Sequence, residues 1–148
     1  MGLLAKLHGT SSAKTEADDV LLLHALFCIA AADGSIEDSE DALIRAYTNT
    51  LPEFRDMDGH AFDTAMNASV QIALAYNRDM KASLVVLAEI KSDAVRNKAF
   101  VLAVDIAMSS GSVDEAEEEM LDAMQRILRI DDSLAAKIFE IVALKYVT

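Results

Sequence analysis

Acidic side chains gather at two points of the chain, each where one predicted helix gives way to the next. The two groups are Asp33, Glu37, Asp38, Glu40 and Asp41, and Asp114, Glu115, Glu117, Glu118 and Glu119. Clustered carboxylates supply the oxygen ligands that hard cations such as calcium require. Acids in the first turn of a helix also stabilise the helix dipole without any ligand. The residues leave two functions open for these acids, cation binding and helix capping.

Motifs of enzymes are scarce. The three histidines have no metal-ligand spacing, and neither H-E-x-x-H nor Glu-x-x-His occurs. There is no glycine-rich phosphate loop and no nucleophile elbow. An EF-hand also fails, because placing Gly34 at the invariant glycine puts Ile29 at the first ligand position. We therefore expect a protein that is not an enzyme.

The acidic groups belong to a repeat with an offset of 77 residues. Identical pairs are Ile29/Ile106, Ala30/Ala107, Gly34/Gly111, Ser35/Ser112, Glu40/Glu117, Ala46/Ala123 and Leu51/Leu128. Each copy predicts an apolar helix, a glycine stop, a serine cap, an acidic first turn and a second helix. We call the segments 31–41 and 108–118 the first and second hinges. Ser112 and Glu115 have the spacing of a capping box, so we expect Ser112 to cap the helix of the second hinge.

Composition favours helices, because the chain has one proline, five glycines and 53% hydrophobic residues. Residues 1–15 are expected to be a leader and linker, and residues 16–148 a single helical domain. We predict an all-α, compact bundle of about seven helices, with two pseudo-twofold-related helix-hinge-helix halves. Expected caps are Asp58 for the third helix, Ser92 for the fifth, and Asp131 or Asp132 for the last. The fourth helix contains Leu84–Ala88.

Three polar residues lie inside apolar helical stretches. Cys28 is the only cysteine, and its apolar neighbours predict a buried, inert thiol. His24 is expected to be structural. Asp105 is the counterpart of Cys28 in the repeat, and a buried carboxylate requires a partner, so we expect a capping or ion-pair role.

The net charge of −12 repels nucleic acid and anionic membranes and favours a basic or helical protein partner. The longest apolar runs are too short to cross a membrane, and Met1–Leu7 does not form a secretory signal. Leu3, Leu4 and Leu7 in the leader predict weak membrane affinity at best. A cytoplasmic location is the default expectation.

The motif of the first hinge resembles the signature of a known protein family. Ala32-Asp33-Gly34-Ser35-Ile36, followed by Glu40, resembles the A-D-G-x-I-x-x-x-E signature of the tellurite-resistance TerB family. The likeness extends from about Ala17 to Val147, and Gly111-Ser112-Val113 with Glu117 resembles the family's second motif. It implies a seven-helix, all-α fold and a non-enzymatic, cytoplasmic or membrane-associated role in stress response.

The resemblance also implies a divalent-cation site, with calcium or magnesium as the candidate ions. Motif matching carries over Asp33 and Glu40 from the first copy and Glu117 from the second as metal ligands. Ser110 departs from the family pattern, which has an aspartate there. Two functions therefore stand side by side: a cation-binding TerB-like module, and a metal-free helical adaptor that binds proteins through an acidic face.

Overall fold

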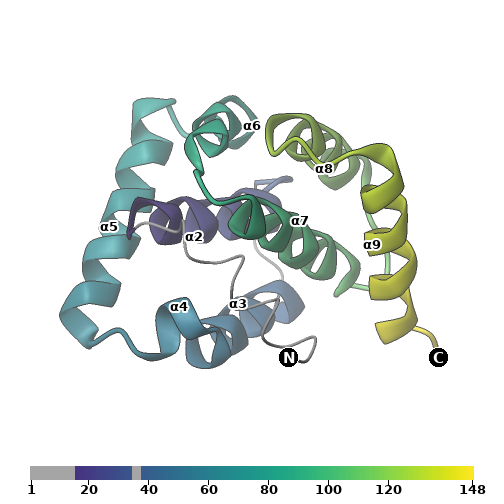
Figure 1. Cartoon of the computed structure of the whole chain (residues 1–148), viewed down its shortest axis with the longest axis horizontal. Coiled ribbons are helices and arrows are strands. Elements are labelled where there is room, and N and C mark those ends of the chain that lie inside the picture. The colour runs from purple at the N-terminus through teal and green to yellow at the C-terminus, as the bar shows by residue number, and fades with distance from the viewer. Residues whose placement is uncertain (1–15, 35–37) are drawn as a thin grey trace, which may run out of the picture.

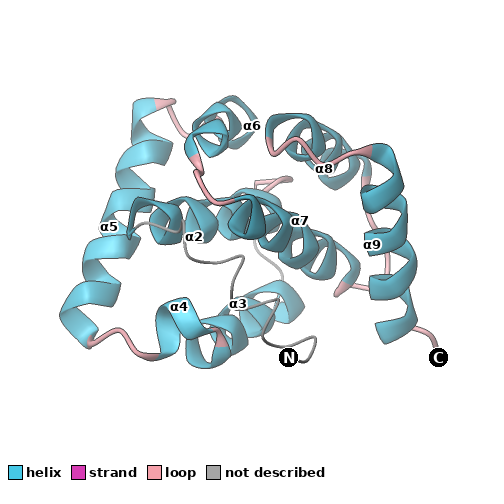
Figure 2. Cartoon of the chain, in the orientation of Figure 1, coloured by secondary structure: helices cyan, strands magenta, loops and turns pink. Residues whose placement is uncertain are grey.

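The computed structural model describes residues 16–34 and 38–148, and within these ranges it contains eight α-helices, one 3-10 helix and no strand (Figure 2). The elements are α2 (Glu16–Ala30), α3 (Asp38–Thr50), α4 (Pro52–Arg55), α5 (Gly59–Ala75), α6 (Met80–Ser83), η1 (Leu84–Glu89), α7 (Asp93–Met108), α8 (Glu115–Ile127) and α9 (Asp132–Lys145). The predicted all-α bundle is confirmed. The expected leader, residues 1–15, lies outside the described residues.

The centre of the molecule is formed by α2 and α7, which pack against each other and are surrounded by the other helices (Figure 1). The consecutive residues Leu22, Leu23, His24 and Ala25 of α2 are all fully buried, and four consecutive residues cover every side of a helix. A helix that is apolar all round belongs in a core, whereas a surface helix carries one apolar stripe. The structure accordingly buries nearly the whole of α2.

The outer helices repeat with the same offset as the sequence. Residues 38–50 form α3 and residues 115–127 form α8, so both bounds differ by 77. The starts of α2 and α7, at residues 16 and 93, differ by the same number. The first two helices of each half thus correspond to each other, as the repeat predicted.

Helices α5 and α9 lie at opposite edges of the molecule (Figure 1). Helix α5 packs on α2 and helix α9 packs on α7, so each central helix has its own flanking helix. The rings of Phe100 in α7 and Phe139 in α9 meet edge to face with centroids 5.8 Å apart, a favoured arrangement for aromatic pairs.

The predicted fourth helix is a single turn of α-helix, α6, followed by the 3-10 helix η1. The fully buried apolar side chains of this region are Leu84 and Leu87 in η1 and Ile90 directly after it. A 3-10 helix has three residues per turn, so side chains three apart share one face. The spacing of these apolar residues matches that period, which explains why the segment departs from a regular α-helix.

Three predicted caps are confirmed. The side chains of Asp58, Ser92 and Asp131 accept hydrogen bonds from the backbone N–H groups of Ala61, Val95 and Leu134. Each bond satisfies a donor that the first turn of a helix leaves open.

The structure also assigns Asp18 a role beyond its own helix. Its buried carboxylate accepts hydrogen bonds from the backbone N–H groups of Lys91 and Ser92 at 3.0 and 3.2 Å. This side chain therefore ties α2 to the start of α7. Among the described helices, none combines the length and apolar character needed to span a membrane.

Candidate functional site

Each hinge turns at a glycine in the left-handed region of backbone space. Gly34 has a φ of 93° and Gly111 a φ of 92°. Only glycine adopts this conformation without a steric penalty. A Cβ built at either position meets no atom of the described residues within 4 Å, so the requirement for glycine comes from the backbone angle.

The second hinge holds a complete capping box, formed by Asp114 and Glu117 and not by Ser112. The Asp114 carboxylate accepts the Glu117 N–H at 2.8 Å, and Glu117 Oε1 accepts the Asp114 N–H at 3.2 Å. The prediction of Ser112 as the cap is therefore wrong. Both serine and aspartate suit the position, and both are followed three residues later by a glutamate, so the local pattern did not decide between them. Ser35, the expected cap of the first hinge, lies outside the described residues.

Glu40 and Glu117 hold equivalent positions in the two copies, and the structure brings their side chains into contact. Both residues are buried, with 4% and 6% of their surface exposed. The Oε2 atom of Glu117 is buried and receives no hydrogen bond from any described residue. We call these two side chains the hinge carboxyl pair.

Burial and neighbouring charge make Glu117 a weak acid. Burial is the main cause that raises its pKa to about 7, with the charges of Asp114 and Glu40 adding to the rise and the hydrogen bond from the Asp114 N–H opposing it. Two adjacent carboxyls that both ionise repel each other, so such pairs retain a proton or gain a cation. In the hinge carboxyl pair, the raised pKa of Glu117 keeps a proton on this side chain below about pH 7.

Asp33, the third predicted metal ligand, is exposed on the first hinge. Within residues 16–34 and 38–148, no three His, Cys, Asp or Glu side chains are grouped so that they could hold a metal ion. The predicted set is therefore split, because Glu40 and Glu117 come together and Asp33 does not complete a group of three with them.

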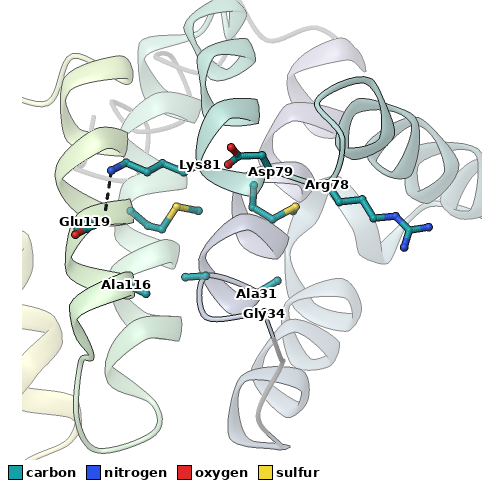
Figure 3. A pocket seen from close by; sticks show the side chains of 10 residues that line it. Ala31, Gly34, Arg78, Asp79, Lys81, Ala116 and Glu119 are labelled. Carbon is teal, nitrogen blue, oxygen red and sulfur yellow. Dashed lines mark hydrogen bonds and ion pairs between the residues drawn. The ribbon is translucent and has the colours of Figure 1, made fainter.

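A cavity of about 280 Å³ lies between the end of α2, the segment 78–81 and the first turns of α8 (Figure 3). Gly34 and Ala116 are part of its lining. On one side Lys81 Nζ lies 3.5 Å from Glu119 Oε2, and the Arg78 side chain extends away from that pair (Figure 3). This opening places solvent beside both hinges.

His24 and Cys28 form a second buried polar cluster, between α2, α5 and α6. His24 Nε2 lies 2.9 Å from Ser83 Oγ, and His24 Nδ1 lies 3.2 Å from Ser69 Oγ. Because Ser83 Oγ donates to the Met80 carbonyl at 2.7 Å, it accepts from His24, and this assigns the proton to Nε2.

This cluster is structural in character, as the sequence predicted for both residues. Burial lowers the pKa of His24 to about 4 and raises that of Cys28 to about 12, with the hydrogen bond between Cys28 and Ser83 opposing the rise. A neutral imidazole with both nitrogens bonded and a protonated thiol without exposed surface lack the reactivity of a base and a nucleophile.

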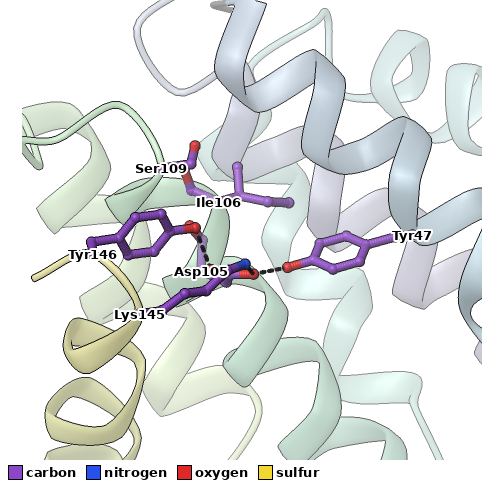
Figure 4. Close-up of polar contacts among 6 residues, drawn as sticks. All are labelled: Tyr47, Asp105, Ile106, Ser109, Lys145 and Tyr146. Atoms are coloured by element: carbon purple, nitrogen blue, oxygen red, sulfur yellow. Dashed lines mark hydrogen bonds and ion pairs between the residues drawn. The ribbon is translucent and has the colours of Figure 1, made fainter.

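Asp105 is the centre of a third cluster, which joins α7 to α3 and α9 (Figure 4). Lys145 Nζ lies 2.9 Å from Asp105 Oδ2, and the hydroxyls of Tyr47 and Tyr146 both donate to the same carboxylate. Burial acts to raise the pKa of Asp105, but the hydrogen bonds from Tyr146, Tyr47 and Lys145 outweigh it and lower the pKa. Burial and the Asp105 charge raise the pKa values of both tyrosines. The expected ion-pair role of Asp105 is confirmed.

Sequence patterns did not find the partners of these clusters. Tyr47 and Lys145 lie 58 and 40 residues from Asp105, and no local spacing signals such contacts. The contact between Glu40 and Glu117 could have been predicted from one feature of the sequence, their equivalent positions in the repeat. Equivalent positions in two halves related by a pseudo-twofold axis meet each other when they lie near that axis.

Comparisons with known proteins do not identify a family for this chain, since no family model, no curated protein and no solved structure matches it.

Proposed function

We propose that this protein is a non-enzymatic, TerB-like helical module in a stress response of the tellurite-resistance type, and that its hinge carboxyl pair takes up a divalent cation in place of a proton. The observation that supports the proposal most is the contact between buried Glu40 and Glu117, one from each copy of the hinge. The Oε2 atom of Glu117, which no described residue satisfies, is a ready ligand atom.

The chemistry of the pair favours calcium or magnesium. Both ions prefer carboxylate oxygens, and magnesium in particular is often held by one or two carboxylates with water completing its shell. A cation must displace the proton that the pair retains near neutral pH. Binding should therefore strengthen as the pH rises through about 7, the pKa of Glu117.

We expect magnesium or calcium at millimolar concentration to raise the melting temperature at pH 8 and to have little effect at pH 5.5, because a ligand selective for the folded state stabilises it. Glu40→Gln and Glu117→Gln should abolish the rise. Glu118→Gln, an exposed site on the same helix, is the matched control and should retain it. Asp33→Asn tests whether Asp33 is a metal ligand. Because Asp33 does not group with Glu40 and Glu117, this variant should also retain the rise in melting temperature.

Isothermal titration calorimetry, together with the melting temperatures, can contradict the metal part of the proposal. If neither ion produces binding heat at pH 8 and none shifts the melting temperature, the hinge carboxyl pair serves only to share a proton and cap helices. The metal part of the proposal would then be wrong, and the module would be metal-free.

A second candidate function, a helical adaptor that binds proteins, has support of its own. Large aliphatic side chains are exposed at both edges of the molecule: Val70 and Leu74 on α5, and Ile141, Leu144 and Val147 on and after α9. Ile141, Leu144 and Val147 are 66%, 69% and 72% exposed. Exposed aliphatic groups that recur on one side of a helix are typical of interaction surfaces.

The adaptor function predicts a basic or helical protein partner in the cytoplasm, attracted by the net charge of −12. Ile141→Ser with Leu144→Ser should weaken partner binding while the melting temperature stays the same, because both side chains are exposed. Partner binding that depends on acidic residues should weaken with salt. Equal binding by the double variant and by wild type, at low and at high salt, would contradict this function.

A further inference from the structure

An apolar groove with an acidic rim opens between α2, α4 and α5, away from both hinges. Its volume is about 650 Å³. Its apolar lining consists of Val20 from α2, Met57 from the turn before α5, and Ala61, Ala65 and Ala68 from α5. The alanines recur at intervals of three or four residues, so they form one face of α5. Small side chains on that face leave room for the side chains of another segment.

The rim of the groove is acidic. Asp19, Glu53, Asp56 and Asp58 all line it. Lys98 forms an ion pair with Glu53 at 2.6 Å, and Asp58 caps α5. Glu53 and Asp58 therefore have defined structural roles. The Asp56 side chain is 79% exposed, with Arg55 at 3.8 Å. The exposed Asp56 and the cap residue Asp58 therefore place negative charge on the rim.

The segment that directly precedes α2 has the complementary chemistry. Residues 1–15 contain no Asp or Glu and include Lys6 and Lys14, whereas the whole chain has a net charge of −12. Leu3, Leu4 and Leu7 add large aliphatic side chains to the same segment. It thus carries two features that complement the described lining of the groove, positive charge at an acidic rim and large aliphatic side chains against small ones.

The connection between the two is short. The groove includes Asp19 and Val20, about one helical turn after Glu16. Gly9-Thr10-Ser11-Ser12 lies between the leucines and α2, and its composition permits a reversal of the chain. A tethered segment binds at a high effective concentration, so even weak intrinsic affinity is sufficient for occupancy.

We propose that residues 1–8 of the chain occupy this groove in cis, with the leucines against the alanine face of α5 and Lys6 at the acidic rim. This inference is independent of the hinge carboxyl pair, because the two sites share no residue. It assigns the groove an occupant from the same molecule, so a basic partner must compete with the leader to reach it.

Paramagnetic relaxation in the full chain tests this placement. Ala5→Cys accepts a nitroxide label, and Cys28 does not compete because it is fully buried. We expect the amide signals of Ala61, Ala65 and Ala68 to lose more than half of their intensity. A label at Glu140→Cys on α9, at the other edge of the molecule (Figure 1), is the control and should leave those signals unchanged.

Two variants separate charge from apolar contact. In the labelled chain, Asp56→Lys and Leu4→Ser with Leu7→Ser should each restore the lost intensity. Asp122→Lys, the same charge reversal at an exposed position of α8, should not restore it. Unchanged broadening in both groove variants would overturn the proposal.

A mixture of labelled chain without isotope and isotope-enriched chain without label detects binding between molecules. We expect no broadening in the mixture. Broadening in the mixture as well as in the labelled, isotope-enriched chain would show that the leader of a second copy fills the groove, and absence of broadening in every sample would show that the leader lies elsewhere. Either result overturns occupancy in cis.

Discussion

Glu117 is both part of a helix cap and a carboxyl group with a raised pKa. Its Oε1 atom completes the capping box, an arrangement that needs no ligand. Contact with Glu40 and burial then raise its pKa to about 7. The capping and cation hypotheses from the sequence therefore concern the same side chain, with one oxygen used for the cap and the other left open.

The raised pKa of Glu117 predicts a loss of stability as pH rises. Its ordinary pKa is 4.5, so between pH 4.5 and 7 the folded state binds the proton that the unfolded state has released. Stability from this group should thus fall across that window and stay low above pH 7. Glu117→Gln removes the effect and can still complete the capping box, so the variant should gain about 1–3 kcal/mol relative to wild type between pH 4.5 and 8.

Urea denaturation at several pH values measures this gain. Glu118→Gln is the control and should follow the wild-type profile. A Glu117→Gln profile parallel to that of wild type across the whole range would contradict the raised pKa.

His24 has the opposite effect on how the folding stability depends on pH. Its pKa falls from 6.5 to about 4 on burial, so the unfolded state binds more protons between these values. Stability from this group is lost as pH falls from 6.5 to 4. The two slopes oppose each other in wild type, and we therefore expect Glu117→Gln to show a stability that rises with pH from 4 to 6.5 and then levels off.

At the scale of the helices, the hinges depend on backbone angle and on one capping box. Gly111 supplies the left-handed residue, and Asp114 with Glu117 begins α8. Ser112 is exposed and lies two residues before the cap. The energetic ranking of these three positions follows directly from their different roles.

We expect Gly111→Val to cost about 1–2 kcal/mol, since a side chain in the left-handed region is strained. Asp114→Ala should cost about 0.5–2 kcal/mol through loss of the cap. Ser112→Ala, the control, should leave the melting temperature nearly unchanged. Thermal denaturation ranks the three, and a larger loss in Ser112→Ala than in Asp114→Ala would show that the helix begins at the serine.

At the scale of the whole molecule, each central helix carries one polar anchor at the same place in the repeat. Cys28 in α2 faces the cluster with His24 and Ser83, and its counterpart Asp105 in α7 faces Tyr47, Tyr146 and Lys145. The two halves share a backbone plan and differ in the polar contacts that join each central helix to its neighbours. The Asp105 cluster has the greater reach, because it connects α7 to both α3 and α9.

Asp105→Asn should lower the stability of the whole bundle by about 1.5–3 kcal/mol, because hydrogen bonds to an ionised group are lost. Tyr47→Phe should cost less, since Lys145 and Tyr146 remain on the carboxylate. Hydrogen exchange of α9 should accelerate in Asp105→Asn. Unaltered exchange in α9 together with unaltered stability would show that this cluster does not hold the helix.

Helix bounds, caps and the hinge glycines are determined by the sequence alone, because they depend on neighbours within about four residues. The offset of 77 appears in the residues and again in the bounds of α3 and α8. Local rules were insufficient where two candidates had equal spacing, as with Ser112 and Asp114. They also missed the 3-10 geometry of Leu84–Glu89, where a three-residue apolar period decided the outcome.

Contacts between distant segments were decided only by the tertiary structure. Packing of α2 on α7 brings Glu40 to Glu117, leaves Asp33 on the surface, and places Asp105 between two tyrosines and a lysine. Burial and neighbouring charge then set the pKa values of these groups, and both arise from residues far apart in the chain. The sequence thus determined which side chains stand at the hinges, and the packing of the helices determined which of them meet.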